Sequence, residues 1–356
     1  MSKPTRIVLN LLLFLLLPLF LTNNVFAQTP FVKNIQNPIF TPLNTNWDTS
    51  SVLNPSIIKD NTETKMWYDG NGGQGWRIGF ARSADGISNW TRTLQPVISI
   101  GENDPGFQEI DNTNPYVIYN SSLGYYQMWY TSVGSNWSGG PDRFRLRYAT
   151  STDGEIWTKY DGWAMLGSQN TWDSGGIARG LSVIYNNGLY QLWYTATDGG
   201  FNWKIGYATS TDGMIWTKQN NGNPVIFATE LWELSNTSYP HVIFENNVYK
   251  MWYAVGTNDL PTKIIYASSA NGLNWSKSSE TILNIGNNGT FDDMFLSRPF
   301  VIRENNIYKM WYSGYDGANW RIGYATANAD ILPTPTPTPT PTNTPTPTPT
   351  NTPTPT

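Results

Sequence analysis

Five short runs along the chain are apolar on both faces of the strands that they would form, and each contains the step Trp-Tyr. A strand that is apolar on both faces must be covered on both sides, whereas a strand with one solvent face alternates apolar and polar residues. The tryptophans follow one another at spacings of 62, 64, 59 and 59 residues, at Trp67, Trp129, Trp193, Trp252 and Trp311. This spacing predicts five copies of one structural unit packed side by side.

The same order of elements surrounds each Trp-Tyr step. A strand such as 54–58, which reads Asn-Pro-Ser-Ile-Ile, comes first, and a turn rich in Asn and Glu leads from it to the Trp-Tyr strand. A third strand such as 204–210 follows, and Asp212-Gly213 turns the chain into a fourth strand at 216–218. Asp-Gly is a strong hairpin signal because the turn needs residues that tolerate positive φ. Four antiparallel strands in each repeat predict an all-β, five-bladed β-propeller.

The fifth repeat lacks its fourth strand, because Pro-Thr sequence begins soon after the third strand at 321–326. A spare strand is found near the other end of the chain, at 31–34. An Asn-Pro step follows it, as one follows the fourth strand at 216–218. We therefore expect the N-terminal strand to complete the fifth blade and to close the ring.

The chain has no cysteine, so its core must supply the stability that disulfides give to many exported proteins. Trp, Tyr and Phe make up 14% of its residues. Burying one tryptophan removes roughly 150 to 250 Å² from water, which is about 4 to 6 kcal/mol before conformational entropy is counted. We therefore assign the five repeated tryptophans to the core rather than to ligand binding.

The two ends of the chain have compositions of their own. A basic start, an apolar run at 7–21 and Ala27 predict a cleavable signal peptide over residues 1–27. Residues 333–356 are almost wholly Pro and Thr, which predicts an extended tail. Residues 28–332 would then form the propeller of a secreted, extracellular protein without a membrane span. The tail could tether it to a cell surface or join it to a downstream module.

The net charge of -4 comes without a long basic run, which argues against a nucleic-acid partner. A low charge with many Trp, Tyr, Asn and Gly residues is typical of surfaces that bind oligo- or polysaccharides. The long loops between second and third strands share one face with the connections that enter each first strand, so ligands are expected there. The aromatic residues that could stack on a sugar at this face are Trp76, Trp137, Phe201 and Trp320.

An aromatic residue with an acid beside it precedes the first strand of every repeat. These groups are Trp47-Asp48, Phe107-Gln108-Glu109, Trp172-Asp173, Trp232-Glu233 and Phe291-Asp292-Asp293. In one interpretation each carboxylate caps a loop by accepting backbone N–H bonds, and recurs because the blade recurs. In the other, some of the acids line a funnel, where paired carboxylates perform acid and base steps on a glycosidic bond.

Blade number, blade length and the strand motifs Pro-x-hydrophobic-Ile and Met-Trp-Tyr make residues 31–332 resemble the five-bladed propeller glycoside hydrolases. The resemblance is to family 43 and its relatives in families 62, 32, 68 and 130, and it implies a fold and a carbohydrate ligand. In family 43 a base, a pKa-tuning Asp and an acid stand at the starts of the first three inner strands. The matching positions here hold Asn54, Asn114 and Arg179, which cannot transfer protons near neutral pH.

Other carboxylates of the ligand face would have to replace them in an enzyme. The candidates are Asp48, Glu109, Asp111, Asp173, Glu233, Asp292 and Asp293. We favour Asp173 and Glu233, with Asp48 as a third, because each stands beside a tryptophan and partial burial could raise its pKa. The residues expected to contact substrate are Asn54, Asn114, Arg179, Arg298, Trp137, Trp76, Trp320, Glu109, Asp111 and Asp293.

His241 is the only histidine and lies on the fourth inner strand, near the propeller axis. A histidine near the axis helps to hold a cation in family 43, so the resemblance implies that His241 could bind a structural calcium ion in the central channel. In the alternative it is simply packed and hydrogen-bonded. No other cofactor is expected. Arg179 and Arg298 could bind the carboxylate of an acidic sugar, or could pair with Asp173 and Asp293.

Two functions therefore stay open, with a purely structural repeat module as a third alternative. The first is a secreted glycoside hydrolase or related carbohydrate-active protein that uses non-standard carboxylates. The second is a non-catalytic propeller that binds glycans or proteins and is displayed on its Pro-Thr stalk.

Overall fold

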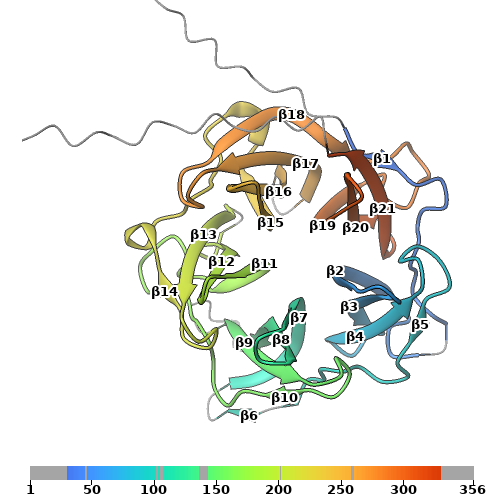
Figure 1. Cartoon of the computed structure of the whole chain (residues 1–356), viewed down its shortest axis with the longest axis horizontal. Coiled ribbons are helices and arrows are strands. Elements are labelled where there is room, and N and C mark those ends of the chain that lie inside the picture. The colour runs from blue at the N-terminus through green and yellow to red at the C-terminus, as the bar shows by residue number, and fades with distance from the viewer. Residues whose placement is uncertain are drawn as a thin grey trace, which may run out of the picture.

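The computed structural model is a ring of five β-sheets around a central axis (Figure 1). The expected signal peptide and the Pro-Thr tail lie outside the residues that it describes, which are 30–44, 46–101, 103–104, 107–135, 143–200, 202–257 and 260–329. Each sheet is antiparallel and corresponds to one sequence repeat. The prediction of an all-β, five-bladed propeller is confirmed.

Every blade contains four strands in common. In blades one to four these strands follow the chain order from the innermost strand to the outermost. Blade one contains β2 (Ser51–Lys59), β3 (Thr64–Asn71), β4 (Trp76–Ser83) and β5 (Thr91–Arg92). Blade two contains β7 (Phe107–Asn120), β8 (Tyr125–Gly134), β9 (Phe144–Ser151) and β10 (Thr158–Lys159), with the short strand β6 (Asn103–Asp104) added beside β7. Blade three contains β11 (Ile177–Asn186), β12 (Leu189–Ala196), β13 (Lys204–Ser210) and β14 (Thr217–Lys218). Blade four contains β15 (Asn236–Glu245), β16 (Val248–Thr257), β17 (Leu260–Ser269) and β18 (Ser276–Asn284).

The N-terminal strand closes the ring. Blade five has the order β1-β21-β20-β19, formed by β19 (Phe295–Glu304), β20 (Ile307–Tyr315), β21 (Trp320–Asn328) and β1 (Val32–Lys33). Val32 pairs with Thr326 in antiparallel register. Phe31, which is 6% exposed, packs into the core, and its backbone N–H donates to the carbonyl of Ile282 at 2.8 Å. The predicted closure is therefore confirmed.

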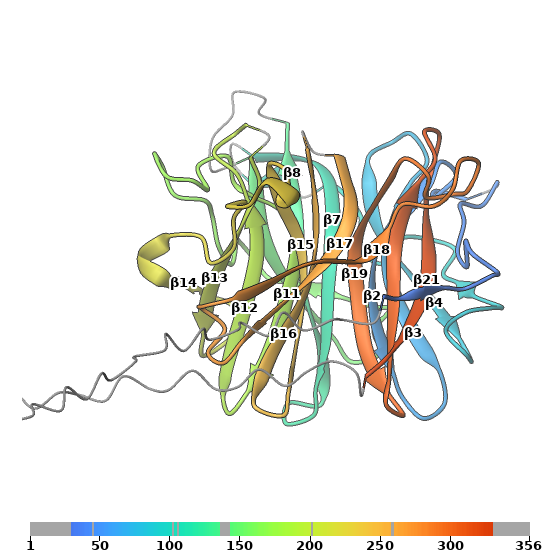
Figure 2. The same ribbon diagram turned by 90° about the horizontal axis from the view of Figure 1, so that it is seen from above.

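The two ends of the propeller differ. From the side, longer connections lie at the upper end of the strands and tight turns at the lower end (Figure 2). The connection from blade three to blade four contains two short 3₁₀ helices, η1 (Asn220–Gly222) and η2 (Leu231–Glu233). No helix within the described ranges is both long enough and apolar enough to cross a membrane.

The repeated tryptophans lie between neighbouring blades, and each is at most 1% exposed, which confirms that they belong to the core. The indoles of Trp67, Trp129, Trp193 and Trp311 donate at 2.7 to 2.9 Å to a glycine carbonyl in a tight turn of the next blade. The accepting residues are Gly86, Gly154, Gly213 and Gly272, with φ between 75° and 86°. These turns therefore need glycine, and they join four of the blades to the next one, whereas the indole N–H of Trp252 in blade four has no hydrogen-bond partner among the described residues.

Candidate functional site

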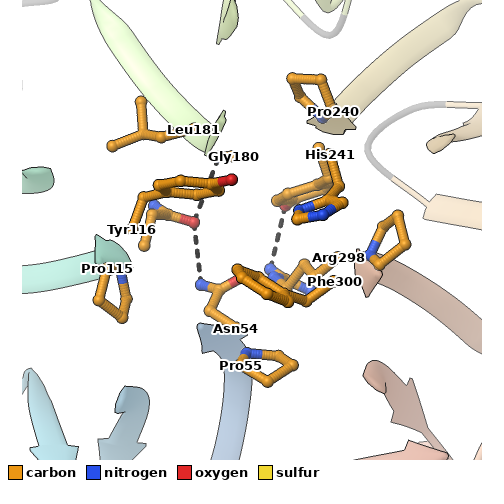
Figure 3. Close-up of a pocket in the computed structure, with 13 residues that line it drawn as sticks. Asn54, Pro55, Pro115, Tyr116, Gly180, Leu181, Pro240, His241, Arg298 and Phe300 are labelled. Carbon is orange, nitrogen blue, oxygen red and sulfur yellow. Dashed lines mark hydrogen bonds between the residues drawn. The ribbon is translucent and has the colours of Figure 1, made fainter. Parts of the chain in front are cut away.

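The innermost strands of the five blades meet around a pocket at the propeller axis (Figure 3). Each blade contributes a two-residue step to its wall. The steps are Asn54-Pro55, Asn114-Pro115, Gly180-Leu181, Tyr239-Pro240 and Arg298-Pro299. Because the strands repeat, the fold places five equivalent side-chain positions in a ring around the axis.

The first residue of each step has a left-handed backbone, with φ of 54° at Asn54, 56° at Asn114, 63° at Gly180, 54° at Tyr239 and 57° at Arg298. At each of them the register with the second strand shifts, as in a β-bulge. Gly and Asn adopt this conformation readily, whereas for Tyr239 and Arg298 it costs on the order of 1 to 3 kcal/mol. Strained residues of this kind are typical of functional sites.

In blade three the residue that matches Asn54 and Asn114 is Gly180, and Arg179 precedes it. A Cβ atom on Gly180 would lie 2.4 Å from the Cα of Tyr239, so no other residue fits there without a shift of the backbone. The sequence comparison had matched Arg179 to Asn54 and Asn114, whereas in the structure Gly180, the next residue, occupies that position. Its guanidinium reaches the Tyr239 hydroxyl, to which Nη1 donates at 3.2 Å.

Asp69 lies directly behind the two asparagines of the pocket wall and is 1% exposed. Its Oδ1 and Oδ2 accept the backbone N–H of Asn114 at 2.9 and 3.1 Å, and its Oδ2 also accepts the Asn54 side-chain amide. The same amide donates to Oδ1 of Asn114 at 2.9 Å, which accepts the N–H of Gly180 at 3.3 Å. One carboxyl group is thus connected to the pocket residues of blades one, two and three.

Burial raises the pKa of Asp69 to about 8, against the donors from Asn54 and Asn114 and the charge of Arg298. The charge of Asp111 adds to the rise. Burial also raises the pKa of Asp111, whose Oδ1 accepts the N–H of Trp76 at 2.7 Å. Near neutral pH, Asp69 therefore carries a proton behind the pocket wall, and a second carboxyl with a raised pKa lies on the neighbouring blade. Such pairs are typical of acid and base chemistry.

Asp69 is the candidate that sequence reasoning missed. The equivalent residues, two places after the repeated tryptophan, are Thr131, Thr195, Ala254 and Ser313. The hydroxyls of Thr195 and Ser313 each accept a backbone N–H of the next blade at 3.0 Å, as Asp69 does. The available signal was a carboxyl group at a position that the other repeats fill with a hydroxyl or a methyl group.

Four of the repeated acids form ion pairs inside their own blades and do not line the central pocket. Asp48, Asp173, Glu233 and Asp292 are each at most 1% exposed. Their partners, at 2.5 to 2.6 Å, come from the outermost strands and are Arg92, Lys218, Lys277 and Lys33. Each acid also accepts the hydroxyl of the tyrosine that follows the core tryptophan, at 2.9 to 3.5 Å.

The aromatic member of these groups packs on the same tyrosine. Trp47 lies parallel to Tyr68 at 6.0 Å between ring centroids, and Trp172 lies parallel to Tyr194 at 5.9 Å. The repeated aromatic-acid step therefore links the entry of the first strand to the last strand of a blade. A catalytic role for Asp173, Glu233 or Asp48 stays a prediction, and these structural contacts do not favour it.

Two other predicted carboxylates also lie outside the pocket wall. Glu109 is 6% exposed and accepts the Ser132 hydroxyl at 2.6 Å and the N–H of Gly101 at 3.2 Å. Asp293 accepts the N–H of Gly289 at 2.7 Å. Their predicted contacts with substrate stay predictions.

Replacing Asp173 by Asn or Glu233 by Gln is expected to lower stability, because each change removes the charge of a buried acid that accepts hydrogen bonds from a half-buried lysine and a tyrosine. Losing a hydrogen bond to a charged group of this kind costs about 1.5 to 3 kcal/mol. Urea unfolding measures the change in the free energy of unfolding. Asp161→Asn, at an exposed position, is the matched control, and its free energy of unfolding should stay within about 0.5 kcal/mol of that of the parent. Unchanged stability with lost turnover would instead restore the catalytic role.

His241 is 2% exposed, and its Nε2–H donates to the carbonyl of Val301 at 2.8 Å. Its ring packs against Phe300 at 4.3 Å and Tyr116 at 6.0 Å between centroids. Burial lowers the pKa of His241 to about 4, so the ring is neutral at neutral pH. Within the described ranges no three His, Cys, Asp or Glu side chains gather as metal ligands. These contacts match the packed and hydrogen-bonded alternative, and calcium binding stays a prediction.

Two tryptophans of the third-strand entries pack against arginines of the innermost strands. Trp76 and Trp320 begin the third strands of blades one and five, and Trp203 directly precedes that of blade three. The guanidinium of Arg298 lies 4.5 Å from the Trp320 ring, and that of Arg179 lies 4.7 Å from the Trp203 ring. The predicted stacking residues Trp137 and Phe201 lie outside the described residues.

The two arginines make other contacts than the predicted alternative pairs with Asp173 and Asp293. Asp173 pairs with Lys218, and Asp293 accepts a backbone N–H. Both arginines instead reach the Tyr239 hydroxyl.

A comparison with protein families finds none that matches the chain. The chain is 32% identical over 171 residues to the uncharacterized protein Rv1502 of Mycobacterium tuberculosis, covering 45% of this chain and 55% of that protein. It is 24% identical over 164 residues to a 1,2-beta-oligomannan phosphorylase of Thermoanaerobacter sp. strain X514, covering 43% and 54%. The matches thus span about half the length of these relatives.

Solved structures share the fold over nearly their whole length. One comes from glycoside hydrolase family 130, a family of mannoside phosphorylases that contains hydrolases targeting β-1,2-mannosidic linkages in Candida mannan. It has a TM-score of 0.66 at 17% identity, covering 87% of this chain and 97% of its own. A glycosyl hydrolase from Bacteroides ovatus has a TM-score of 0.66 at 18% identity, covering 86% and 97%. The chain therefore has the five-bladed fold of these carbohydrate-active proteins.

Proposed function

We propose that the protein is a carbohydrate-active enzyme that cleaves a glycosidic bond at the central pocket, with Asp69 as its proton donor. The observation that carries this proposal is the buried Asp69 carboxyl, whose pKa is raised to about 8 and which hydrogen-bonds to Asn54 and Asn114 of the pocket wall. A departing glycosidic oxygen needs a proton, and a carboxylic acid that is neutral at working pH can deliver it. Asp111 would be the second carboxyl of the pair.

The sugar would bind where the asparagine amides now bond to each other. The Asn54 amide connects Asp69 to Asn114, so a sugar oxygen that takes its place would contact the carboxyl directly. Trp76 and Trp320, which begin the third strands of blades one and five, would contact further sugar rings. The likeness in fold to glycoside hydrolases and the partial match to an oligomannan phosphorylase support a glycan as the substrate.

A second candidate is a propeller that binds glycans without cleaving them. Asp69 is 1% exposed, and Gly180 occupies the position at which family 43 carries its acid. In this case Asp69 would hold the two pocket asparagines in place. Glycan binding is common to both candidates, and only turnover separates them.

We further propose that the protein is exported and acts outside the cell. The basic start, the apolar run at 7–21 and Ala27 support a signal peptide, and the Pro-Thr sequence of residues 333–356 supports a stalk. An extracellular position would bring the pocket to polysaccharides of the surroundings.

We expect the purified protein to bind at least one oligosaccharide on a glycan array and to release product from a matching nitrophenyl glycoside or oligosaccharide. The assay is run with and without inorganic phosphate, so that hydrolysis and phosphorolysis are both detected. Binding without turnover in either condition would favour the second candidate. Absence of any glycan binding at millimolar concentration would overturn the proposed function.

A further inference from the structure

Trp163 is the most exposed of the described tryptophans, with 47% of its surface open to solvent. It lies in the segment 160–165, which follows β10 at the outer side of blade two and returns along β9 (Figure 1). Tyr160, at the start of the same segment, is 38% exposed. Covering such rings removes apolar surface from water, so an exposed aromatic pair is a ready contact for a ligand. We call Tyr160 and Trp163 the rim pair.

The segment that carries the rim pair is fixed to the third strand of its blade. The N–H of Tyr160 donates to the carbonyl of Tyr148 at 2.8 Å. The N–H of Ala164 donates to the carbonyl of Leu146 at 2.7 Å, and the N–H of Leu146 donates back to the carbonyl of Met165 at 3.0 Å. Because this backbone is already ordered, a ligand that contacts the two rings loses less free energy in ordering them.

The indole of Trp163 is also supported from one side. The guanidinium of Arg145, which is 7% exposed, lies 4.7 Å from the Trp163 ring and 3.9 Å from the Phe107 ring. A guanidinium stacked between two aromatic rings holds both of them in place. The part of the indole that Arg145 does not cover faces the solvent.

Blade two differs at this position from three other blades. In blades one, three and five a proline directly precedes the residue that makes the second backbone bond to the third strand, at Pro96, Pro224 and Pro38. In blade two Trp163 takes the place of that proline. A residue that the blade needs for folding recurs with the blade, so the single tryptophan indicates a function of its own.

The rim pair lies at the end of the propeller that carries the long connections. The third strand β9 begins at that end (Figure 2), and Leu146, its third residue, pairs with Met165 of the segment. A four-stranded blade is about 15 Å wide. A chain of several sugars would therefore reach from the propeller axis to the rim pair, whereas a disaccharide would not.

We propose that Tyr160 and Trp163 form a second glycan-binding site, which holds an outer part of the polysaccharide that is cleaved in the central pocket. This inference rests on the proposed function, because the rim pair would serve the same substrate. A sugar ring presents C–H groups on its face and hydroxyls around its edge. Its face can therefore stack on an indole or a phenol ring while its hydroxyls stay in water.

The size of the exposed surface favours a sugar over a protein as the ligand. A buried aromatic side chain covers about 150 to 250 Å², so the exposed parts of the rim pair offer roughly 130 to 210 Å². A stable protein interface covers about 800 Å² on each partner. The rim pair is therefore too small for a protein partner and comparable in area to one or two sugar rings.

The test measures binding of polysaccharides by affinity electrophoresis, in native gels that contain α-mannan, glucomannan, arabinoxylan or mixed-linkage β-glucan. We expect at least one polymer to retard the parent protein. Trp163→Ala should weaken binding of that polymer roughly threefold to 30-fold, because it removes the larger exposed ring. Calorimetric titration of the disaccharide from the same polymer should show a smaller change, since a disaccharide does not span both sites.

Further variants assign the effect to the rim pair. Trp163→Phe keeps a ring on Arg145 and should lose less affinity for the polymer than Trp163→Ala, and Tyr160→Ala tests the second ring independently. Leu94→Ala is the matched control, because Leu94 is 79% exposed on the corresponding segment of blade one. Its affinity for the polymer should equal that of the parent. Thermal melting of each variant checks that the fold is kept.

The outcomes separate this inference from the proposed function. If Trp163→Ala and Tyr160→Ala bind the polymer as tightly as the parent, the rim site is wrong and the glycan function stands. The same holds if only short oligosaccharides bind. If no saccharide of any length binds, both are wrong. If Trp163→Ala changes the mass of the protein in sedimentation and leaves polymer binding unchanged, the ring contacts another protein chain and the inference is overturned.

Discussion

Asp69→Asn is expected to lower the turnover of any glycoside that the protein cleaves by about 10²-fold to 10⁴-fold, the usual contribution of a general acid. Binding of the same glycan should change much less, because Asn54 and Asn114 of the pocket wall remain. The measurements are kcat from product release and Kd from titration calorimetry. A loss confined to kcat would identify Asp69 as a group that acts on the reaction.

The variant should fold, because asparagine resembles the protonated form of aspartic acid. The new side-chain amide would keep one oxygen as an acceptor for the N–H of Asn114, and the Asn54 amide can turn to present its oxygen. Asp161→Asn, at an exposed position, is the control for the substitution itself. Equal kcat in Asp69→Asn and the parent would remove Asp69 from the mechanism.

The pH dependence gives a second readout of the same carboxyl. Because the pKa of Asp69 is raised to about 8, the parent loses its proton donor above that pH, and turnover should fall there. The stability of the fold also falls as the pH rises. The neutral carboxyl contributes stability that is fully present below its unfolded pKa of 3.8 and is lost as pH rises to about 8. As the pH rises from 4 to 8, the melting temperature of the parent should therefore fall relative to that of Asp69→Asn.

The fold could be predicted from the sequence because the repeat signals burial and strand order together. Trp-Tyr runs at regular intervals require cover on both faces, and Asp-Gly steps fix the turns. The closing strand was predictable too, since the fifth repeat lacks a strand that residues 31–34 can supply. All of these inferences use local patterns, and local patterns carry over directly to a repeat architecture.

The site was harder to predict from the sequence, because the geometry of the ring brings its side chains together from different blades. Asp69 lies beside the buried Trp67 and Tyr68 on a core strand, so its pattern indicates burial and gives no sign of Asn114 in the next blade. Similarly, Arg179, Tyr239 and Arg298 converge from three blades and are about 60 residues apart along the chain. Sequence spacing alone does not show which side chains face the same point of an axis.

The repeated acids show the opposite case, in which a visible pattern invites a chemical interpretation and the structure shows contacts within the blade. Asp48, Asp173 and Glu233 recur with an aromatic neighbour, and each pairs with a base 44 or 45 residues later, on the last strand of its blade. The sequence alone shows this pattern, because a Lys or Arg recurs at that separation after each acid. A motif repeated in almost every blade serves the blade, whereas a residue found in one blade only, such as Asp69, is the better functional candidate.

Deleting residues 28–40 is expected to abolish folding of the propeller. The deletion removes β1, and with it Phe31 and Phe40, which are 6% and 2% exposed, and Lys33, the ion-pair partner of the buried Asp292. Truncating a buried Phe costs about 3 to 5 kcal/mol, and removing the partner of a buried charge costs about as much. The total of about 9 to 15 kcal/mol equals the whole stability of a typical domain, about 5 to 15 kcal/mol. It would also leave β21 as an open edge, which favours aggregation.

Single substitutions in the same strand separate closure of the ring from mere shortening of the chain. Phe31→Ala should lower the free energy of unfolding by about 3 kcal/mol or more, whereas Val32→Ala, at a side chain that is 70% exposed, should change it by less than about 0.5 kcal/mol. Urea unfolding followed by tryptophan fluorescence measures both, because the core tryptophans report on packing between blades. If the truncated protein is soluble and melts within a few degrees of the parent, the β1–β21 pairing does not hold the ring closed, and the fifth blade is stable with three strands.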